Sequence, residues 1–70
     1  MSDIFLNNCI RVKRIELGLS QTDLAHDAGT TQTTLSAIEN GKWNPSVKLA
    51  LLLSLRLNCK VEDLFWLSKD

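Results

Sequence analysis

The pattern of apolar and polar residues between Ser20 and Gly41 predicts two short helices joined by a tight turn. Apolar residues recur there at the three- and four-residue spacing that places side chains on one face of a helix. These positions are Leu24, Ala28, Leu35 and Ile38. The outer surface of the second helix is small, polar and uncharged, so a partner could approach it closely.

Both helices have start and stop signals in the sequence. Ser20 and Asp23 have the three-residue separation of a capping box, which marks the start of the first helix. Gly29 is expected to end that helix, because glycine readily takes the left-handed conformation that closes a helix. Thr31 is expected to cap the second helix, and Gly41 to end it.

Three further helices are expected in the rest of the chain. One runs over residues 9–18, with Asn7 or Asn8 as its N-cap. Another follows Pro45 and occupies residues 47–57, and a short one covers about Val61 to Phe65.

The two ends of the chain carry short apolar runs. Residues 4–6 (IFL) could form an edge strand, or a disordered tail with a hydrophobic anchor. Residues 65–67 (FWL) are similar in character.

Length and charge limit the function. The 70 residues allow a single domain, residues 1–70, with a modest core and no room for a second, ligand-sensing domain.

Eight basic and eight acidic residues balance, whereas many DNA-binding domains are clearly basic. The placement of charge matters as well as its sum, and Arg11, Lys13 and Arg14 cluster in the first helix. Any binding to nucleic acid is therefore expected to be of modest affinity, with a shallow salt dependence.

The reactive residue types are sparse. Cys9 and Cys59 have no closely spaced partner and are expected to be reduced thiols that pack as small apolar side chains. His26 is the single histidine and no Cys-x-x-Cys spacing occurs, so no metal and no cofactor are expected. No nucleophile–base arrangement is evident, and the chain is not expected to be an enzyme.

No targeting or membrane segment is expected. Residues 1–6 lack the charged and apolar regions of a signal peptide. The leucine-rich run over residues 49–57 is too short to span a bilayer. We therefore expect a soluble, cytoplasmic protein with no membrane contact.

The segment RIELGLSQTDLAHDAGTTQTTLSAIENGK, residues 14–42, resembles the helix-turn-helix of the lambdoid phage repressor and Cro proteins, the Cro/C1-type (XRE-like) family. The match includes the runs LGLSQ, GTTQ and IENGK. WNPS at residues 43–46 and VEDLF at residues 61–65 extend the likeness to small stand-alone regulators of the same family.

The resemblance implies an all-α fold, a five-helix lambda-repressor-like DNA-binding domain with the helix-turn-helix at its second and third helices. It also implies that the termini pair as a short two-stranded ribbon. In this family the arginine at Arg14 forms a structural pair with the glutamate that ends the recognition helix, here Glu39. The alternative is an ordinary solvated arginine. A partly buried pair would specify orientation more than it adds stability.

The resemblance makes the second helix of this motif the recognition helix, whose N-terminal end enters the major groove of double-stranded DNA. Gln32 can donate and accept at once, which suits adenine N6 and N7, and a threonine methyl can contact thymine. The face has no arginine to read guanine, so A·T-containing contacts are favoured. The residues expected to read bases are Thr31, Gln32, Thr33, Ser36 and Ala37. Ala37 departs from the family pattern, so no known operator sequence carries over.

The DNA backbone is expected to be held from both sides of the recognition helix. By resemblance Gln21, in the first turn of its helix, contacts a phosphate, which the N-terminus of a helix favours. Lys42 is a phosphate clamp by charge. Trp43 could pack on a sugar or cover the edge of the core. The full set is Arg14, Ser20, Gln21, Asn40, Lys42, Trp43 and Asn44.

The helix over residues 47–57 is apolar nearly all round, which favours burial on more than one side. By resemblance, its inward positions are Val47, Ala50, Leu53, Ser54 and Leu57. The other leucines are expected to form a homodimer interface, or to be covered by the terminal strands within one subunit. The expected interface residues are Leu51, Leu52, Leu55, Val61, Phe65 and Trp66.

These features favour a sequence-specific DNA-binding transcriptional regulator, a repressor that binds a palindromic operator as a homodimer. The alternative is an antitoxin-like or other protein-interaction module, in which the leucine surface over residues 47–57 holds a protein partner.

Overall fold

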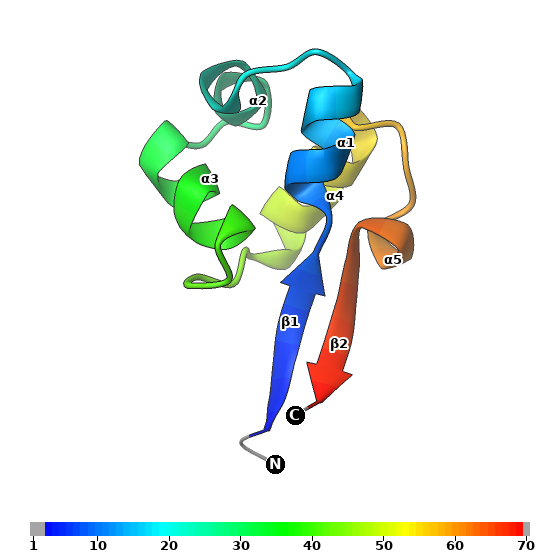
Figure 1. Ribbon diagram of the computed structural model, residues 1–70. Coiled ribbons are helices and arrows are strands. Elements are labelled where there is room, and N and C mark those ends of the chain that lie inside the picture. The colour runs from blue at the N-terminus through cyan, green and yellow to red at the C-terminus, as the bar shows by residue number, and fades with distance from the viewer. Residues whose placement is uncertain (1–2, 70) are drawn as a thin grey trace.

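The computed structural model describes residues 3–69, which form five helices and one two-stranded sheet (Figure 1). In chain order the elements are β1 (Ile4–Asn8), α1 (Ile10–Glu16), α2 (Gln21–Asp27), α3 (Gln32–Glu39), α4 (Val47–Arg56), α5 (Val61–Leu64) and β2 (Phe65–Lys69). The prediction of five helices with a terminal ribbon is confirmed. No helix among residues 3–69 reaches the length and apolarity needed to cross a membrane.

The side-chain caps predicted at Ser20 and Thr31 are confirmed, but among residues 3–69 the Asp23 side chain makes no return bond to complete the capping box. Ser20 and Thr31 each accept a hydrogen bond from the backbone N–H three residues later, at 3.0 and 3.1 Å. Gly29 and Gly41 both have a φ of 73°, the left-handed conformation that ends a helix. The start and the end of each helix are thus set by its own local sequence.

The start of α1 differs in detail from the prediction. Cys9 is at the N-cap position and makes no side-chain cap hydrogen bond. Asn8 lies one residue earlier, and its Oδ1 accepts from the Ile10 backbone N–H at 3.0 Å. The Nδ2 of Asn8 donates to the Ile38 carbonyl at 3.0 Å, so one side chain joins β1, α1 and α3.

One cluster of buried apolar side chains lies between the helices. Its members are Ile10, Leu24, Ala25, Ala28, Leu35, Ile38, Leu53, Leu57, Leu64 and Phe65. Ser54 is buried as well, and its hydroxyl donates to the Leu51 carbonyl at 2.9 Å, which satisfies its hydrogen-bonding capacity. Every helix contributes to this core, so the core fixes how α2 and α3 are held.

The inward face of α4 matches its prediction in part. Leu53 and Ser54 are buried and Ala50 is partly buried, as expected. The prediction that Val47 points inward is wrong, because this residue is 78% exposed. Four residues separate Val47 from Leu51, and four separate Leu51 from Leu55. All three therefore lie on one outward stripe of the helix.

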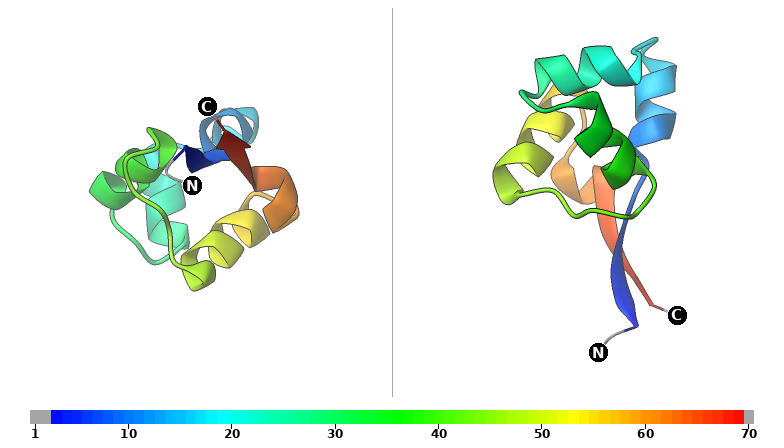
Figure 2. Two further views of the ribbon diagram at one scale, coloured as in Figure 1. Left: turned by 90° about the horizontal axis from the view of Figure 1, so that it is seen from below. Right: turned by 90° about the vertical axis from the view of Figure 1, so that its left-hand side faces the viewer.

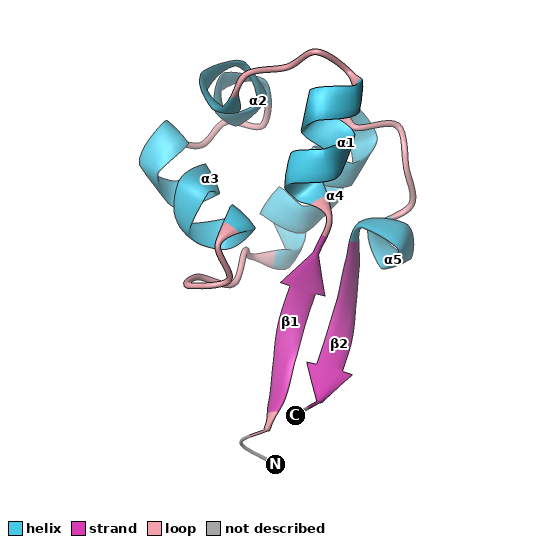
Figure 3. Ribbon diagram, viewed as in Figure 1, coloured by secondary structure: helices cyan, strands magenta, loops and turns pink. Residues whose placement is uncertain are grey.

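β1 and β2 pair antiparallel, with Ile4 opposite Lys69 and Asn8 opposite Phe65. Figure 2 shows this ribbon projecting from one end of the helical body, and Figure 3 shows it as the one non-helical layer of the described chain. Of the two alternatives for residues 4–6, the edge strand is therefore confirmed. The short helix expected to about Phe65 ends at Leu64, and Phe65 begins β2.

Leu53→Ala is expected to lower the free energy of unfolding by about 2–5 kcal/mol, because it leaves a cavity at a fully buried site. Urea unfolding followed by circular dichroism measures this change. Leu55→Ala on the same helix is the matched control, since Leu55 is 75% exposed. Equal losses for the two variants would contradict the placement of the core.

Candidate nucleic-acid interface

α2 and α3 pack against each other across the turn formed by residues 28–31 (Figure 1). Within this turn the Thr30 backbone N–H donates to the Ala25 carbonyl at 2.9 Å. The buried sides of α2 and α3 carry Leu24 and Leu35, respectively. The N-terminal end of α3 faces away from this core, and its first residues are exposed.

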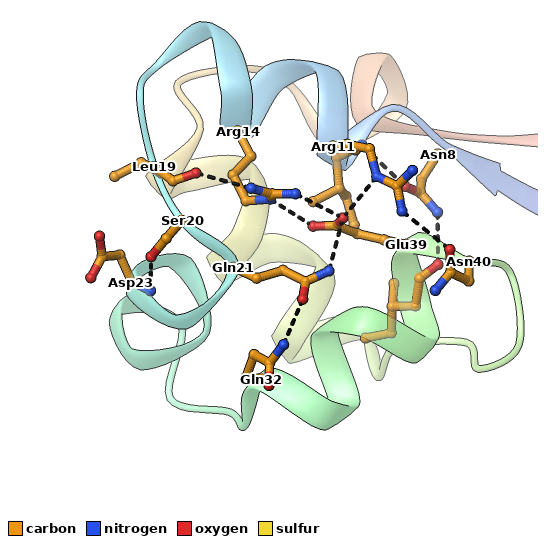
Figure 4. Close-up of polar contacts among 12 residues, drawn as sticks. Asn8, Arg11, Arg14, Leu19, Ser20, Gln21, Asp23, Gln32, Glu39 and Asn40 are labelled. Atoms are coloured by element: carbon orange, nitrogen blue, oxygen red, sulfur yellow. Dashed lines mark hydrogen bonds and ion pairs between the residues drawn. The ribbon is translucent and has the colours of Figure 1, made fainter.

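A carboxylate at the end of α3 is the centre of a polar network (Figure 4). The Glu39 side chain has no exposed surface. Arg14 donates to both of its oxygens, from Nε at 2.9 Å and from Nη2 at 3.2 Å. Arg14 also donates from Nη1 to the Leu19 carbonyl at 3.0 Å. The structure thus brings Arg14 and Glu39 together, and the guanidinium ties α1 to α3 and to the segment before α2.

The protonation of Glu39 reflects this environment. Burial acts to raise the pKa of its carboxyl group. Hydrogen bonds from Arg14 and Gln21, with further help from Arg11, outweigh burial, and the pKa lies below its ordinary value. The carboxylate is therefore ionised at neutral pH and acts only as an acceptor.

Gln21 links this carboxylate to the surface of α3. Its Nε2 donates to Glu39 Oε1 at 3.2 Å, so its Oε1 is left to accept. Gln32 Nε2 donates to that oxygen at 2.8 Å. The charge on Glu39 thereby sets which way the Gln21 amide points, and Gln21 in turn sets the amide of Gln32 (Figure 4).

Arg11 belongs to the same network, although the sequence identified it only as part of a basic cluster. Its Nε lies 3.5 Å from Glu39 Oε1, and its Nη2 donates to Asn40 Oδ1 at 3.2 Å. The three-residue spacing of Arg11 and Arg14 was the available signal, because it places both on one face of α1. Asn40 is left with its amide N–H groups as donors toward solvent.

The residues expected to read bases lie along one face of α3. Thr31, Gln32 and Thr33 are exposed, and Ser36 and Ala37 are half-buried. The Thr31 hydroxyl accepts from the Thr34 backbone N–H and lies 3.0 Å from the Thr34 hydroxyl, so it is already engaged as a cap. Gln32 and Thr33 are the more available side chains.

Of the seven residues expected to hold the DNA backbone, Arg14 and Asn40 belong to the Glu39 network, and the Arg14 side chain is only 13% exposed. The other five fall into two groups. Lys42, Trp43 and Asn44 are exposed in the loop after α3, whereas Ser20 and Gln21 lie at the start of α2. Trp43 is 63% exposed and lines a shallow hollow with Thr33, Thr34, Ala37 and Lys42. Most of the Trp43 side chain therefore lies outside the core.

Of the six residues expected at a homodimer interface, three are exposed and three are buried or partly buried. Leu51, Leu55 and Trp66 are exposed. Leu52 and Val61 are partly buried against the core, and Phe65 belongs to the core at 8% exposure. Phe65 is therefore covered within one subunit, by the core that it joins at the start of β2.

Among residues 3–69, no group of three or more histidine, cysteine or acidic side chains is arranged to hold a metal ion. Cys9 and Cys59 are free thiols that pack at the edge of the core. Burial raises the pKa of the Cys59 thiol, so this residue is a thiol at neutral pH.

Two short helices packed across a tight turn are a feature of DNA-binding helix-turn-helix proteins. The helix-turn-helix family profile matches residues 10–64. The chain belongs to this family, in its Cro/C1-type (XRE-like) branch, whose members are DNA-binding transcriptional regulators.

Known proteins similar to the chain have regulatory names. YgzD, an HTH-type transcriptional regulator of Bacillus subtilis, is 37% identical over 65 residues, which cover 93% of this chain and 98% of YgzD. The solved structure of SinR, a master regulator for biofilm formation in complex with DNA, is 35% identical with a TM-score of 0.70. The likeness covers 76% of this chain and 86% of the chain in that structure. The restriction-modification controller protein C.AhdI of Aeromonas hydrophila is 30% identical with a TM-score of 0.73, over 77% of this chain and 82% of C.AhdI.

Glu39→Gln is expected to destabilise the fold by about 3 kcal/mol at pH 7, because it removes the charged partner of a buried arginine pair. A lowered pKa in the folded state adds stability above the ordinary glutamate pKa, and that stability is lost as pH falls through the folded value. Wild type should therefore lose stability from about pH 5 downward, and the variant should lose less. Urea unfolding at several pH values measures both effects.

Glu62→Gln is the control for this experiment, because Glu62 is exposed and makes no ion pair within residues 3–69. The pKa of Asp27 is also lowered, through its hydrogen bond from Arg56, so some acid sensitivity will persist in Glu39→Gln. A variant as stable as wild type at pH 7 would show that the network adds nothing to the fold.

Proposed function

We propose that residues 1–70 act as one domain that binds a specific DNA operator as a homodimer and represses transcription. α2 and α3 are the helix-turn-helix, and α3 is the recognition helix that enters the major groove. The observation that carries this proposal is the exposed Gln32 amide at the N-terminal end of α3, held by Gln21 and through it by the buried Glu39.

Base reading follows from the free groups of Gln32. One N–H is used on Gln21, which leaves the carbonyl oxygen and the second N–H. These two groups match the N6 donor and N7 acceptor of adenine. Because the amide is oriented before binding, less side-chain freedom is lost on contact. Thr33 adds a methyl and a hydroxyl beside it, and Ser36 and Ala37 lie one turn further.

Phosphate contacts come from the two ends of this surface. Gln21 and Ser20 lie at the N-terminus of α2, where unpaired N–H groups favour an anion. Lys42 and Asn44 follow α3, and Asn40 has its amide N–H groups turned out by Arg11. Trp43 packs on a sugar beside them. The balanced net charge is compatible with this function because Lys13 and Arg56 pair with acids away from this surface.

Repression by a homodimer is the simplest mechanism for a domain of this kind. Two copies related by a two-fold axis would place their recognition helices about 34 Å apart, one turn of DNA, on a palindromic operator. The regulatory names of YgzD, SinR and C.AhdI support a role in transcription. A bound dimer would block polymerase without needing an effector.

A protein-interaction role is the second candidate. The outward stripe of α4, formed by Val47, Leu51 and Leu55, is apolar and is 52–78% exposed. Such a stripe suits a groove or helix of another protein. Copurification with a second protein, and loss of that protein in Leu55→Glu, would favour this role.

Gln32→Ala is expected to weaken binding to a selected operator by about 1–3 kcal/mol and to relax its sequence preference, while the fold stays intact. Gln21→Ala should cause part of the same loss, and the double variant should lose less than the sum of the two. Fluorescence anisotropy with operator and random duplexes measures these changes. Wild-type affinity in both single variants would show that the groove assignment is wrong.

Lys42→Ala is expected to weaken binding to all duplexes alike. Each phosphate contact adds about −0.9 to the slope of log K against log salt, so the slope should become shallower by about that amount. Lys60→Ala is the control, because Lys60 is exposed at the start of α5, on the opposite side of the body from α3 (Figure 1). An unchanged slope in Lys42→Ala would place this lysine outside the interface.

A further inference from the structure

The polar network around Glu39 holds one positive charge more than the carboxylate needs. Arg14 reaches both oxygens of Glu39, at 2.9 and 3.2 Å, and the two side chains are 13% and 0% exposed. This pair is balanced in charge and enclosed. Arg11 is a second guanidinium beside the same carboxylate, its side chain is 57% exposed, and an arginine stays charged in proteins. The charge of Arg11 is therefore left over at the surface of α1.

The contacts of Glu39 Oε1 show that Arg11 is its most weakly held donor. This oxygen already receives Arg14 Nη2 and Gln21 Nε2, each at 3.2 Å, and these two donors match its two lone pairs. Arg11 Nε lies farther away, at 3.5 Å. A hydrogen bond between two ionised groups is normally about 2.7–2.9 Å long. Arg11 can therefore turn to another acceptor without leaving the carboxylate unsatisfied.

Asn40 orients the guanidinium of Arg11. Arg11 Nη2 donates to Asn40 Oδ1 at 3.2 Å, so the contact joins α1 to the residue that follows α3. Figure 4 shows the two side chains next to each other. Both N–H groups of Arg11 Nη1, the second one of Nη2 and both of Asn40 Nδ2 have no partner within residues 3–69. A charged fork and a neutral amide are thus presented together, with their donors open.

We propose that Arg11 and Asn40 together form a phosphate-binding site that holds the DNA backbone beside α3. The planar fork of a guanidinium matches two oxygens of a phosphate, and the amide of Asn40 adds a further donor. Arg11 lies on α1, outside α3 and its loop, and is not among the seven residues expected at the backbone. This inference rests on the proposed function, because DNA is the source of its phosphate.

The charges around this site favour a chain of phosphates over a single anion. Lys42 follows Asn40 by two residues, is exposed and makes no ion pair within residues 3–69. Within the same residues, Arg11 pairs with no acid other than the already neutralised Glu39. Asn40 therefore has an uncompensated cation from α1 on one side and one from the following loop on the other. Successive phosphates of a DNA strand can use both.

The test measures the affinity of the full chain for a random-sequence duplex at several salt concentrations, by fluorescence anisotropy. Arg11→Gln removes the charge and keeps donors for Asn40. It should weaken binding about tenfold and make the slope of log K against log salt shallower by about 0.9, the value for one phosphate contact. Lys13→Gln is the matched control, because Lys13 is two residues along α1, lies near Glu16 at 4.0 Å and points to another face. Its slope should equal that of wild type.

Two further variants separate a phosphate contact from general charge and from a structural role. Arg11→Lys keeps the charge but lacks the fork, so it should restore the slope and only part of the affinity. Asn40→Ala should cost little more in the Arg11→Gln background than Arg11→Gln alone, because both residues act on one phosphate. Urea unfolding of each variant completes the test, since a structural role would lower stability and leave the slope unchanged.

A wild-type slope in Arg11→Gln, an equal change in Lys13→Gln, or additive losses with Asn40→Ala would overturn the proposal. Inorganic phosphate, compared with chloride at equal ionic strength, is expected to displace the duplex no better. Stronger displacement by phosphate, lost in Arg11→Gln, would make this a site for free phosphate and would overturn the assignment to DNA. A random duplex requires no base reading, so failure at Arg11 and failure of Gln32 to read bases are separate results.

Discussion

The buried carboxylate of Glu39 is the constraint on which the functional surface depends. Its side chain is fully buried at the end of α3, so its charge must be compensated by hydrogen-bond donors. Arg14 supplies two from α1, and Gln21 supplies one from α2. The same contacts that satisfy the charge therefore hold three helices in one relative orientation. They also fix the amide of Gln32, so the stability of the fold and the orientation of the exposed polar face have one physical origin.

The sequence predicts those features that local chemistry determines. Ser20 and Thr31 are caps because of their side chains, and Gly41 ends α3 because of its free φ. Val47 shows the limit of prediction from sequence. An apolar residue in the first turn of a helix can face the core or the solvent, and the position of the neighbouring loop decides between them. The Gln21–Gln32 contact joins two helices across a turn, and no periodicity in the sequence reports such a contact. The family resemblance, and not the apolar pattern, implied the terminal ribbon.

Net charge is a poor guide to the function of this chain. Eight basic and eight acidic residues cancel in the sequence, and several of them pair with one another in the structure. Arg14 neutralises Glu39, and Arg56 pairs with Asp27 at 2.7 Å between the ends of α4 and α2. The groups that remain around α3 are amides, hydroxyls and Lys42. A surface of this kind favours selective contact with base edges over strong non-specific attraction to phosphate.

Amide chemical shifts during a titration with duplex DNA test the role of α3 most directly. Nitrogen-15-labelled protein would be titrated with a duplex that it enriches from a random pool. We expect the largest shifts at Gln21, along residues 31–37 and in the loop over residues 40–44, with the outward stripe of α4 unchanged. Shifts confined to α4, or no shifts at low salt from a folded protein, would contradict the assignment of α3 as the DNA-reading helix.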